Sequence, residues 1–301
     1  MNNNIFSASP RLCVKFLFVF LITMSLLGSC TRREKPPAAV IIEGEPQRIV
    51  SLVPAVTEIL FAIGAGDKVV GVTQFCDYPP EAKTKTSVGG FSGAVVSVEQ
   101  IRALQTDLVI LSGDMHGRII SLLNDLGIRS LAVEPRTFSE IYDVIARIGE
   151  ISGCAEGAET VIAEMKTKIA ETEEFVRDKE KAAVFFMLAE NPLMTSGLHT
   201  FVSEAIDLSG GRNIFEDTEE FWPQVSSEQV LLRKPDWILF ASNMGTTPFF
   251  GNPFWQSLSA VREGRISPVD SDILCRYGPR LADAVVTISK ILHGLPKSGG
   301  F

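Results

Sequence analysis

Cys30 is the residue whose chemistry the sequence indicates most clearly. A short basic stretch is followed by the apolar run 16–27, and the small residues Gly28 and Ser29 come directly before the cysteine. This order is typical of a cleaved export signal, and the run is shorter than the ~20 apolar residues that a membrane-spanning helix needs. We therefore expect residues 1–29 to be a lipoprotein signal peptide. Cys30 should carry the lipid and hold the protein on the periplasmic or cell-surface side of a membrane.

No combination of residue types in the chain forms a recognisable catalytic group. A Gly-x-Ser-x-Gly motif is absent, and Ser196 and His199 lack the strand–turn–helix context that serine hydrolases need. The glycine pairs 89–90 and 210–211 have neither P-loop nor dinucleotide-binding spacing, so we expect them to be turns. We predict a protein that is not an enzyme and needs no cofactor. An extracellular hydrolase is the alternative from another functional class.

The cysteines and histidines give no support for a metal centre. Once the signal is removed and Cys30 is acylated, the remaining cysteines are Cys76, Cys154 and Cys275, with no CxxC pair. An odd number of thiols allows at most one internal disulfide, and the sequence leaves open whether any pair forms. His116 and His199 each lie near a predicted turn, where we expect solvated side chains. No metal site is therefore predicted.

The mature chain is acidic. Removal of residues 1–29 takes away Arg11 and Lys15 but no acid, which lowers the formal net charge from −8 to −10. An acidic surface repels the phosphate backbone, so we expect no nucleic acid partner. Residues 30–47 are rich in charges, proline and glycine and should form a flexible tether between the lipid and the folded part.

From residue 48 the chain alternates short apolar segments with helical patterns. We expect strands at 49–53, 69–73, 108–111 and 130–133, and helices at 57–63, 98–104, 119–126 and 138–151. Strict alternation is typical of a mainly parallel sheet with helices on both faces. Residues 48–155 are therefore predicted to form an N-terminal α/β lobe.

A long helical stretch precedes a second lobe. Residues 156–181 contain no proline and place apolar side chains at helical spacing among many Glu and Lys residues. Alternation then resumes, with strands expected at 182–188, 237–241 and 266–269 and helices at 201–209, 227–232 and 279–292. The predicted fold class is two α/β lobes with mainly parallel sheets, the second spanning 182–295, joined by a single long connecting helix. A ligand cleft is expected between the lobes.

Aromatic side chains gather in the predicted loops. Examples are Phe75, Phe91 and Trp222, with Arg276 and Tyr277 near the last helix. Each aromatic residue alone is most often a packed loop anchor. Several together, on loops that follow strands, indicate a large and partly apolar ligand.

Four segments resemble the cobalamin-binding proteins of bacterial ABC importers. They are residues 48–58 (RIVSLVPAVTE), 71–82 (GVTQFCDYPPEA), 222–229 (WPQVSSEQ) and 271–280 (SDILCRYGPR). They occur in the family's order and at similar spacing. The resemblance implies a two-lobe receptor for vitamin B12 or a related corrinoid. Because the wider family also carries siderophores and haem, a ferric siderophore or haem receptor of the same fold is the alternative.

The resemblance also implies which residues bind the ligand. By motif position they are Pro54, Ala55, Phe75, Phe91, Trp222, Asp272 and Arg276. The aromatic side chains would cover the corrin, and Asp272 and Arg276 would form hydrogen bonds with its peripheral amides. An ordinary i to i+4 ion pair between Asp272 and Arg276 is the alternative.

The chain departs from the family pattern at four positions. Family members can carry tyrosine where Phe75 stands and tryptophan where Phe91 and Ser112 stand. Ser209 occupies the position of a cysteine that forms a disulfide in some members, so that bridge is not expected. Weaker or altered corrinoid selectivity would follow.

Two glutamates open similar helices in the two lobes. Glu99 precedes Gln100 and Glu228 precedes Gln229, each at a capping-type helix start. In the resembling family, acids at these positions dock onto arginines of a homodimeric ABC permease, which implies that partner for an otherwise monomeric receptor. The alternative is that both are only first-turn acids that complement the helix dipole.

Overall fold

Two parallel β-sheets flanked by helices make up the chain in a computed structural model, which describes residues 44–90, 92–244 and 251–294. All of these belong to one folded unit, Ile41–Phe301. The predicted signal peptide, Cys30, most of the predicted tether, and Phe91 lie outside the described residues. None of the helices in the described ranges combines the length and the apolar composition of a membrane-spanning segment.

The first lobe is built on a five-stranded parallel sheet with the order β3-β2-β1-β4-β5. The strands are β1 (Ile49–Ser51), β2 (Val69–Val72), β3 (Thr86–Ser87), β4 (Leu108–Leu111) and β5 (Arg129–Ala132). The α-helices are α2 (Pro54–Ala62), α3 (Val98–Ala103), α4 (Gly113–Asp125) and α5 (Phe138–Ser152), with short 3₁₀ helices η1 (Gly66–Lys68), η2 (Pro80–Thr84) and η3 (Gly93–Val95).

The second lobe is built on a four-stranded parallel sheet with the order β11-β10-β6-β9. The strands are β6 (Ala182–Met187), β9 (Gly211–Asn213), β10 (Trp237–Ala241) and β11 (Ile266–Val269), and a small antiparallel pair is formed by β7 (Ala189–Glu190) and β8 (Leu193–Met194). The helices are α7 (Phe201–Leu208), α8 (Ser227–Arg233), α10 (Pro253–Ser257), α11 (Ser259–Arg262), α12 (Ser271–Leu274) and α13 (Leu281–His293), with the 3₁₀ helix η4 (Ser242–Met244).

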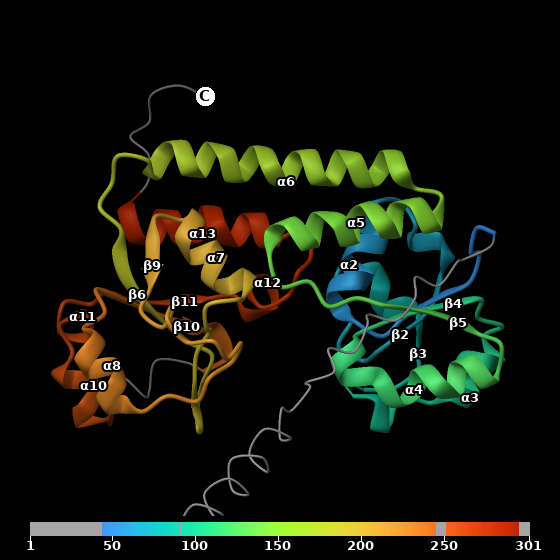
Figure 1. Cartoon of the computed structure of the whole chain (residues 1–301), viewed down its shortest axis with the longest axis horizontal. Helices are drawn as coiled ribbons and strands as arrows, with labels where there is room; N and C mark the ends of the chain where they lie inside the picture. The colour runs from blue at the N-terminus through green and yellow to red at the C-terminus, as the bar shows by residue number, and fades with distance from the viewer. Residues whose placement is uncertain (1–43, 91, 245–250, 295–301) are drawn as a thin grey trace, which may run out of the picture. The chain divides into compact units, whose positions relative to one another are not determined.

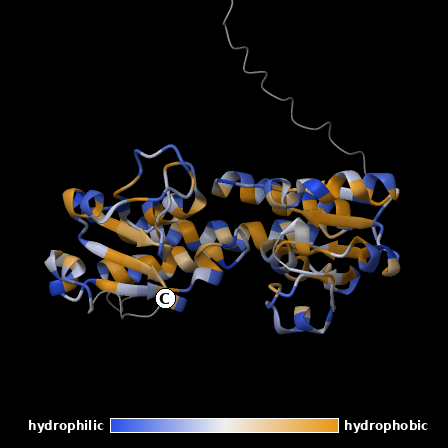
Figure 2. Ribbon diagram, turned by 90° about the horizontal axis from the view of Figure 1, so that it is seen from below, coloured by the Kyte–Doolittle hydropathy of each residue, from blue (hydrophilic) through white to orange (hydrophobic). Residues whose placement is uncertain are grey.

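Alternation of buried side chains along the strands explains why helices cover both faces of each sheet. In β4, Leu108 and Ile110 enter one apolar core, and Val109 and Leu111 enter another. Successive strand residues point to opposite faces, so a strand that is apolar at every position must be covered on both sides. Figure 2 shows the orange, apolar strands inside each lobe and blue, hydrophilic positions on the flanking helices. The predicted two-lobe α/β fold class is confirmed.

The connecting helix α6 (Ala155–Val176) links the lobes through a shared core. It packs on α5 of the first lobe and on α13 of the second, as Figure 1 shows. Val161, Met165 and Ile169 of α6 belong to one apolar cluster that also contains strand residues of both sheets. The helix ends at Val176, not at residue 181 as predicted, because the amide of Lys179 bonds back to the Val176 carbonyl and turns the chain toward β6.

Some predicted boundaries were wrong, and some short elements were missed. α4 begins at Gly113, not at residue 119, because the Ser112 hydroxyl caps the Met115 amide. Gly211 is not part of a turn but opens β9, where it pairs with Ala182. A Cβ on Gly211 would lie 2.9 Å from Ile206 Cγ2, so this strand needs glycine for close packing.

Truncation of Met165 tests the shared core. Met165→Ala should lower the free energy of unfolding by about 2–4 kcal/mol, because it leaves a cavity in a buried layer. The exposed neighbour Glu164→Ala is the control and should change little. Because the apolar cluster is continuous, both lobes should unfold in one transition in urea. Two separated transitions in the wild-type protein would contradict a shared core.

Candidate functional site

Polar and aromatic residues follow the carboxyl ends of strands in both lobes. β1 leads into Pro54, β2 into the loop 73–79, β4 into Ser112, and β11 into Asp270. Parallel strands end at one edge of their sheet, which is where open α/β sheets bind ligands. The candidate site is formed by these loops.

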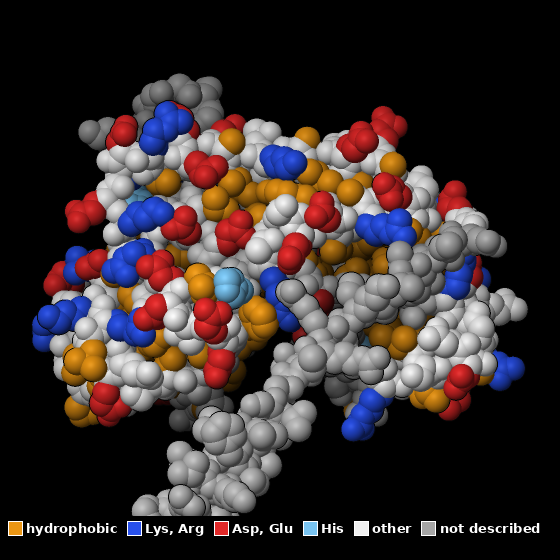
Figure 3. All heavy atoms as spheres, in the orientation of Figure 1, with side chains coloured by type: hydrophobic (Ala, Val, Ile, Leu, Met, Phe, Trp, Pro, Cys, Tyr) orange, Lys and Arg blue, Asp and Glu red, His pale blue; other side chains and the backbone are white. Residues whose placement is uncertain are grey.

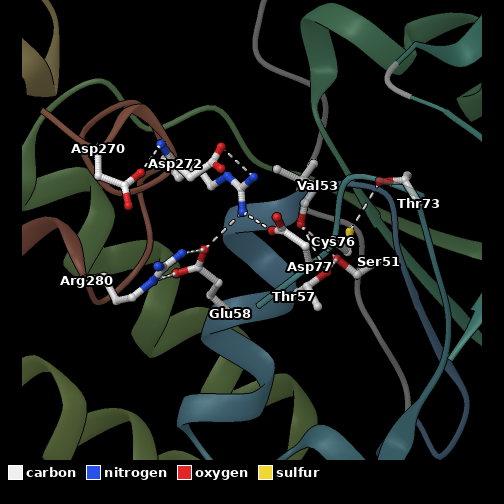
Figure 4. Close-up of polar contacts among 11 residues, drawn as sticks. Ser51, Val53, Thr57, Glu58, Thr73, Cys76, Asp77, Asp270, Asp272 and Arg280 are labelled. Atoms are coloured by element: carbon white, nitrogen blue, oxygen red, sulfur yellow. Dashed lines mark hydrogen bonds and ion pairs between the residues drawn. The ribbon is translucent and has the colours of Figure 1, made fainter. Parts of the chain in front are cut away.

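A short hydrogen-bond chain fixes the start of α2. Thr57 Oγ1 donates to Ser51 Oγ at 2.9 Å, and Ser51 Oγ donates to the Val53 carbonyl at 3.1 Å. Pro54 opens the helix, where its missing N–H costs no hydrogen bond. These contacts fix the start of the helix from which Glu58, one turn further along, points toward Arg280 of the second lobe (Figure 4).

Glu58 is the buried centre of an ion-pair cluster that joins the lobes. Its side chain is 2% exposed. Arg280 binds both carboxylate oxygens, with Nε 2.9 Å from Oε2 and Nη2 2.6 Å from Oε1. Arg276 Nη1 lies 3.4 Å from Oε1. Paired Arg–carboxylate hydrogen bonds of this kind are strong and directional, so they define how the two lobes meet at this point.

Arg276 is shared between acids of both lobes. It donates through Nη1 to Asp77 Oδ1 and through Nη2 to Asp272 Oδ1, each at 2.7 Å. Burial opposes the charge of the guanidinium, but the hydrogen bond to Asp77 and the charges of Asp272, Asp77 and Glu58 raise the pKa of Arg276 above its ordinary value. The i to i+4 ion pair between Asp272 and Arg276 is present. Contact of either residue with a ligand stays a prediction.

The cluster carries an excess of negative charge. Burial opposes ionisation of Asp77, yet the hydrogen bond and charge of Arg276 prevail and lower the pKa of this carboxyl group. Three carboxylates, those of Glu58, Asp77 and Asp272, face the guanidiniums of Arg276 and Arg280, which leaves a formal charge of −1. Elsewhere, on the face drawn in Figure 3, lysines and arginines lie among aspartates and glutamates.

Two aromatic side chains of the loop after β2 are partly exposed. Phe75 and Tyr78 are each 42% exposed. The guanidinium of Arg280 lies 3.8 Å from the centroid of the Tyr78 ring, so the ion-pair cluster supports this side chain. At the start of α2, Pro54 is half-buried and Ala55 is buried.

The loop that carries Trp222 is pinned by backbone contacts. The amide of Gly197 donates to the Phe221 carbonyl at 2.9 Å, and the amide of Thr195 donates to the Pro223 carbonyl at 3.2 Å. Trp222 is partly buried and packs on the core that both lobes share. Arg136 of the first lobe lies 3.4 Å from the ring centroid of Phe221. The predicted ligand contact Trp222 is therefore held at a point where the lobes touch.

His116 is not a solvated turn residue, as was expected, but is fully buried on α4. Its Nδ1 accepts a hydrogen bond from the Ser112 amide at 3.2 Å. Burial lowers the pKa of His116, so the ring is neutral at pH 7. Ser112 donates its hydroxyl to Glu134 Oε2 at 2.7 Å. His199 is exposed, as predicted.

Glu99 and Glu228 are both exposed first-turn residues of short helices. Ser97 caps α3 and also donates to Glu99 Oε2 at 3.1 Å. Hydrogen bonds from its own amide and from the hydroxyls of Ser226 and Ser227 lower the pKa of Glu228. The helix-start role is therefore present in both lobes, and permease docking stays a prediction.

The three cysteines in the described ranges, Cys76, Cys154 and Cys275, are all free thiols. Cys275 is half-buried, and its burial together with the charges of Asp272 and Asp270 raises the pKa of the thiol to about 12. Ser209 donates its hydroxyl to the carbonyls of Ala205 and Val285. A hydrogen bond from this residue therefore joins α7 to α13.

Three residues of the cluster were missed from the sequence: Glu58, Asp77 and Arg280. Glu58 interrupts the apolar face of α2, and an acid on a face that must be buried indicates a partner of opposite charge. Arg276 and Arg280 are four residues apart, a spacing that would have suggested a shared partner. No local sequence pattern predicts that Glu58 pairs with Arg276 and Arg280, because more than two hundred residues separate the partners.

Comparison with known proteins places the chain in one family. A family model described as periplasmic binding protein matches residues 49–273. The uncharacterized ABC transporter substrate-binding lipoprotein YvrC of Bacillus subtilis is 34% identical over 263 residues, which cover 84% of this chain and 82% of the relative.

Solved structures show the same architecture. The periplasmic vitamin B12-binding protein of Vibrio cholerae matches with a TM-score of 0.72 and 31% identity, covering 82% of this chain and 96% of its own. A periplasmic heme-binding protein of Roseiflexus matches with a TM-score of 0.74 and 26% identity, covering 83% of this chain and 98% of its own. Similar folds therefore serve different ligands, and the ligand must be argued from the site.

Loss of Arg280 tests the ion-pair cluster. Arg280→Ala should lower the free energy of unfolding by about 3 kcal/mol, because the buried Glu58 carboxylate keeps only the longer contact to Arg276. The exposed pair of Arg177 and Glu174 is the matched control, and Arg177→Ala should change stability by less than about 0.5 kcal/mol. Urea unfolding measures both. Equal, small effects would mean that Glu58 is not held by Arg280 in solution.

Proposed function

The chain belongs to the periplasmic binding protein family, and on this premise we propose that it is the substrate-binding lipoprotein of an ABC importer and that its ligand is cobalamin or a related corrinoid. It captures the ligand outside the cytoplasm and delivers it to the membrane permease. It performs no covalent chemistry and needs no cofactor of its own. The premise is supported by the relatives in Bacillus and Vibrio at 34% and 31% identity.

The charge of the ion-pair cluster is the observation that carries the choice of ligand. Arg276 and Arg280 are both bound to carboxylates, and the cluster as a whole has an excess of acid. A receptor for haem or for an acidic ferric chelate needs cations that can pair with the ligand's own carboxylates. The amide-rich edge of a corrinoid has no such charges and suits a neutral or slightly acidic wall.

Aromatic and small residues complete the proposed site. Trp222 and Phe75 offer flat apolar surface for the macrocycle, and Pro54 and Ala55 border the site at the start of α2. Phe91 is assigned to the site from the resemblance alone. Because Ser112 binds Glu134 and provides no aromatic surface, we expect a broader corrinoid specificity than in receptors with tryptophan there.

The proposed lipid on Cys30 ties the receptor to the outer face of a membrane. It rests on the signal-like residues 1–29 and on the name of the Bacillus relative, a lipoprotein. Labelling cells with a radioactive fatty acid tests the anchor. Incorporation should be lost in Cys30→Ala, and labelling of that variant would contradict the assignment.

Isothermal titration calorimetry of the purified protein is the experiment that tests the ligand. Cyanocobalamin and cobinamide should bind, whereas haem and ferric hydroxamates should give no specific heat. Binding of haem or a ferric hydroxamate without binding of either corrinoid would replace the proposal by the haem or siderophore receptor. Turnover of an ester or peptide substrate would favour the hydrolase instead.

Trp222 should be a principal contact. An indole can bury ~200 Å² against a macrocycle, so Trp222→Ala should weaken corrinoid binding by at least about tenfold while the fold survives. Quenching of tryptophan fluorescence on titration gives the affinity of the wild type, and calorimetry gives that of the variant. Trp237→Phe is the control, because Trp237 is the first residue of β10 and so lies at the end of the strand opposite its carboxyl end. An unchanged affinity in Trp222→Ala would remove this residue from the site.

We propose that Glu99 and Glu228 dock the two lobes onto a homodimeric permease, with a monomeric receptor providing one acid per subunit. Both carboxylates are exposed, and each sits at the first turn of a matching helix. A symmetric partner presents the same cation twice, so two similar lobes need one acid each.

Charge reversal separates docking from the helix-start role. Glu99→Arg with Glu228→Arg should leave corrinoid affinity unchanged and abolish uptake of labelled cyanocobalamin by cells. Glu99→Gln with Glu228→Gln is the milder variant and should reduce uptake without abolishing it. Normal uptake with both charges reversed would show that these acids serve the helices alone.

A further inference from the structure

We propose that Glu58 is a positioning residue that fastens the two lobes together beside the ligand site and sets the place of Arg276. This inference concerns how the lobes are held, and its link to ligand affinity rests on the proposed function. The group that makes the fastening consists of Glu58 and Asp77 from the first lobe and Arg276 and Arg280 from the second. We call it the interlobe clasp.

Every strong contact of the clasp crosses from one lobe to the other. Glu58 lies on α2, and its bidentate partner Arg280 directly precedes α13. Arg276 reaches back to Asp77, in the loop after β2, at 2.7 Å. Figure 4 shows the Glu58 carboxylate facing the guanidinium of Arg280. Among the described residues, the partners of the Glu58 carboxylate, Arg276 and Arg280, both come from the second lobe.

Close packing around Glu58 adds to the constraint. A Cβ on Gly278 would lie 2.9 Å from Glu58 Oε2 and 3.4 Å from Glu58 Cβ. The backbone between Arg276 and Arg280 therefore passes directly over the carboxylate, and a side chain at Gly278 would push it away. The ion pairs of the clasp therefore form only when the segment 276–280 packs against α2.

Separation of the lobes at this edge would break the clasp at a cost. The Glu58 carboxylate would lose its charged hydrogen bonds unless water entered with the movement, and buried charges without partners are unfavourable. The lobes are also connected by the Phe138 amide, which donates to Glu204 Oε2 at 2.8 Å, and by the shared core under α6. Unlike these two connections, the clasp includes Arg276, which is a predicted ligand contact.

Loss of Glu58 should therefore displace Arg276. In the native cluster Arg276 is held by Glu58 and Asp77 of the first lobe and by Asp272 of its own lobe. Without Glu58, we expect the Arg276 side chain to move toward Asp272. A binding site that is less well organised before the ligand arrives binds more weakly.

Hydrogen–deuterium exchange of the full chain, purified in detergent, tests the clasp in both directions. Glu58→Gln on the first lobe should increase exchange in residues 274–284 of the second lobe by about tenfold, because that segment opens more often. Arg280→Lys keeps the charge but loses the paired geometry, and should increase exchange in α2 of the first lobe. Asp217→Asn, which breaks a bidentate pair with Arg233 inside the second lobe, is the control and should affect only its own surroundings.

The outcomes separate positioning from a local effect on stability. If Glu58 only stabilises its own helix, Glu58→Gln raises exchange in α2 but not in residues 274–284, and the clasp is wrong. If the clasp exists, both variants raise exchange in the opposite lobe. Calorimetry with cyanocobalamin should then show an affinity about tenfold lower for Glu58→Gln and unchanged for Asp217→Asn.

The experiments also distinguish an error in the proposed ligand from an error in the clasp. If the wild-type protein gives no heat with cyanocobalamin, the function is wrong, but the exchange results still decide whether the clasp exists. If the wild type binds and Glu58→Gln binds equally well while exchange rises in the opposite lobe, the lobes are fastened but Arg276 is not positioned by Glu58, and that half of the inference is overturned.

Discussion

A buried carboxylate between two arginines of the opposite lobe is the constraint on which the site depends. Glu58 can remain at 2% exposure because Arg280 satisfies both of its oxygens and Arg276 stands close by. That requirement fixes where the segment before α13 meets α2. It also keeps the guanidiniums of Arg276 and Arg280 paired with carboxylates. The lobe arrangement and the proposed ligand preference therefore share one physical cause, since the ion pairs that join the lobes also occupy Arg276 and Arg280.

The elements that the sequence predicted best are those with a strong local signal. β10 and β11 match their expected bounds, and α5 matches within a residue, because apolar runs and capping residues mark them. β9 was missed because Gly211 and Asn213 have low strand propensity, and its place comes from pairing with β6. His116 was expected in solvent because its burial depends on tertiary packing of α4, which no turn residue reveals.

The sequence predicted only part of the site, because only some of its contacts have a local signal. Asp272 and Arg276 are four residues apart, so their ion pair was foreseeable, and the resemblance drew attention to both. The roles of Glu58, Asp77 and Arg280 arise only when residues about two hundred positions apart meet. The helix starts at Glu99 and Glu228 were predictable from Ser–x–Glu–Gln spacing alone. The sequence alone could not predict which charged residues pair when they lie far apart along the chain.

A crystal structure of the protein with cyanocobalamin bound tests the central claim most directly. The claim is that a neutral, amide-edged macrocycle occupies a site whose arginines are already paired with acids. We predict that Trp222 lies in van der Waals contact with the corrin, while Arg280 stays on Glu58 and Arg276 keeps Asp77. A complex in which Arg276 and Arg280 have left these carboxylates, or in which the corrinoid lies away from Trp222, would contradict the account.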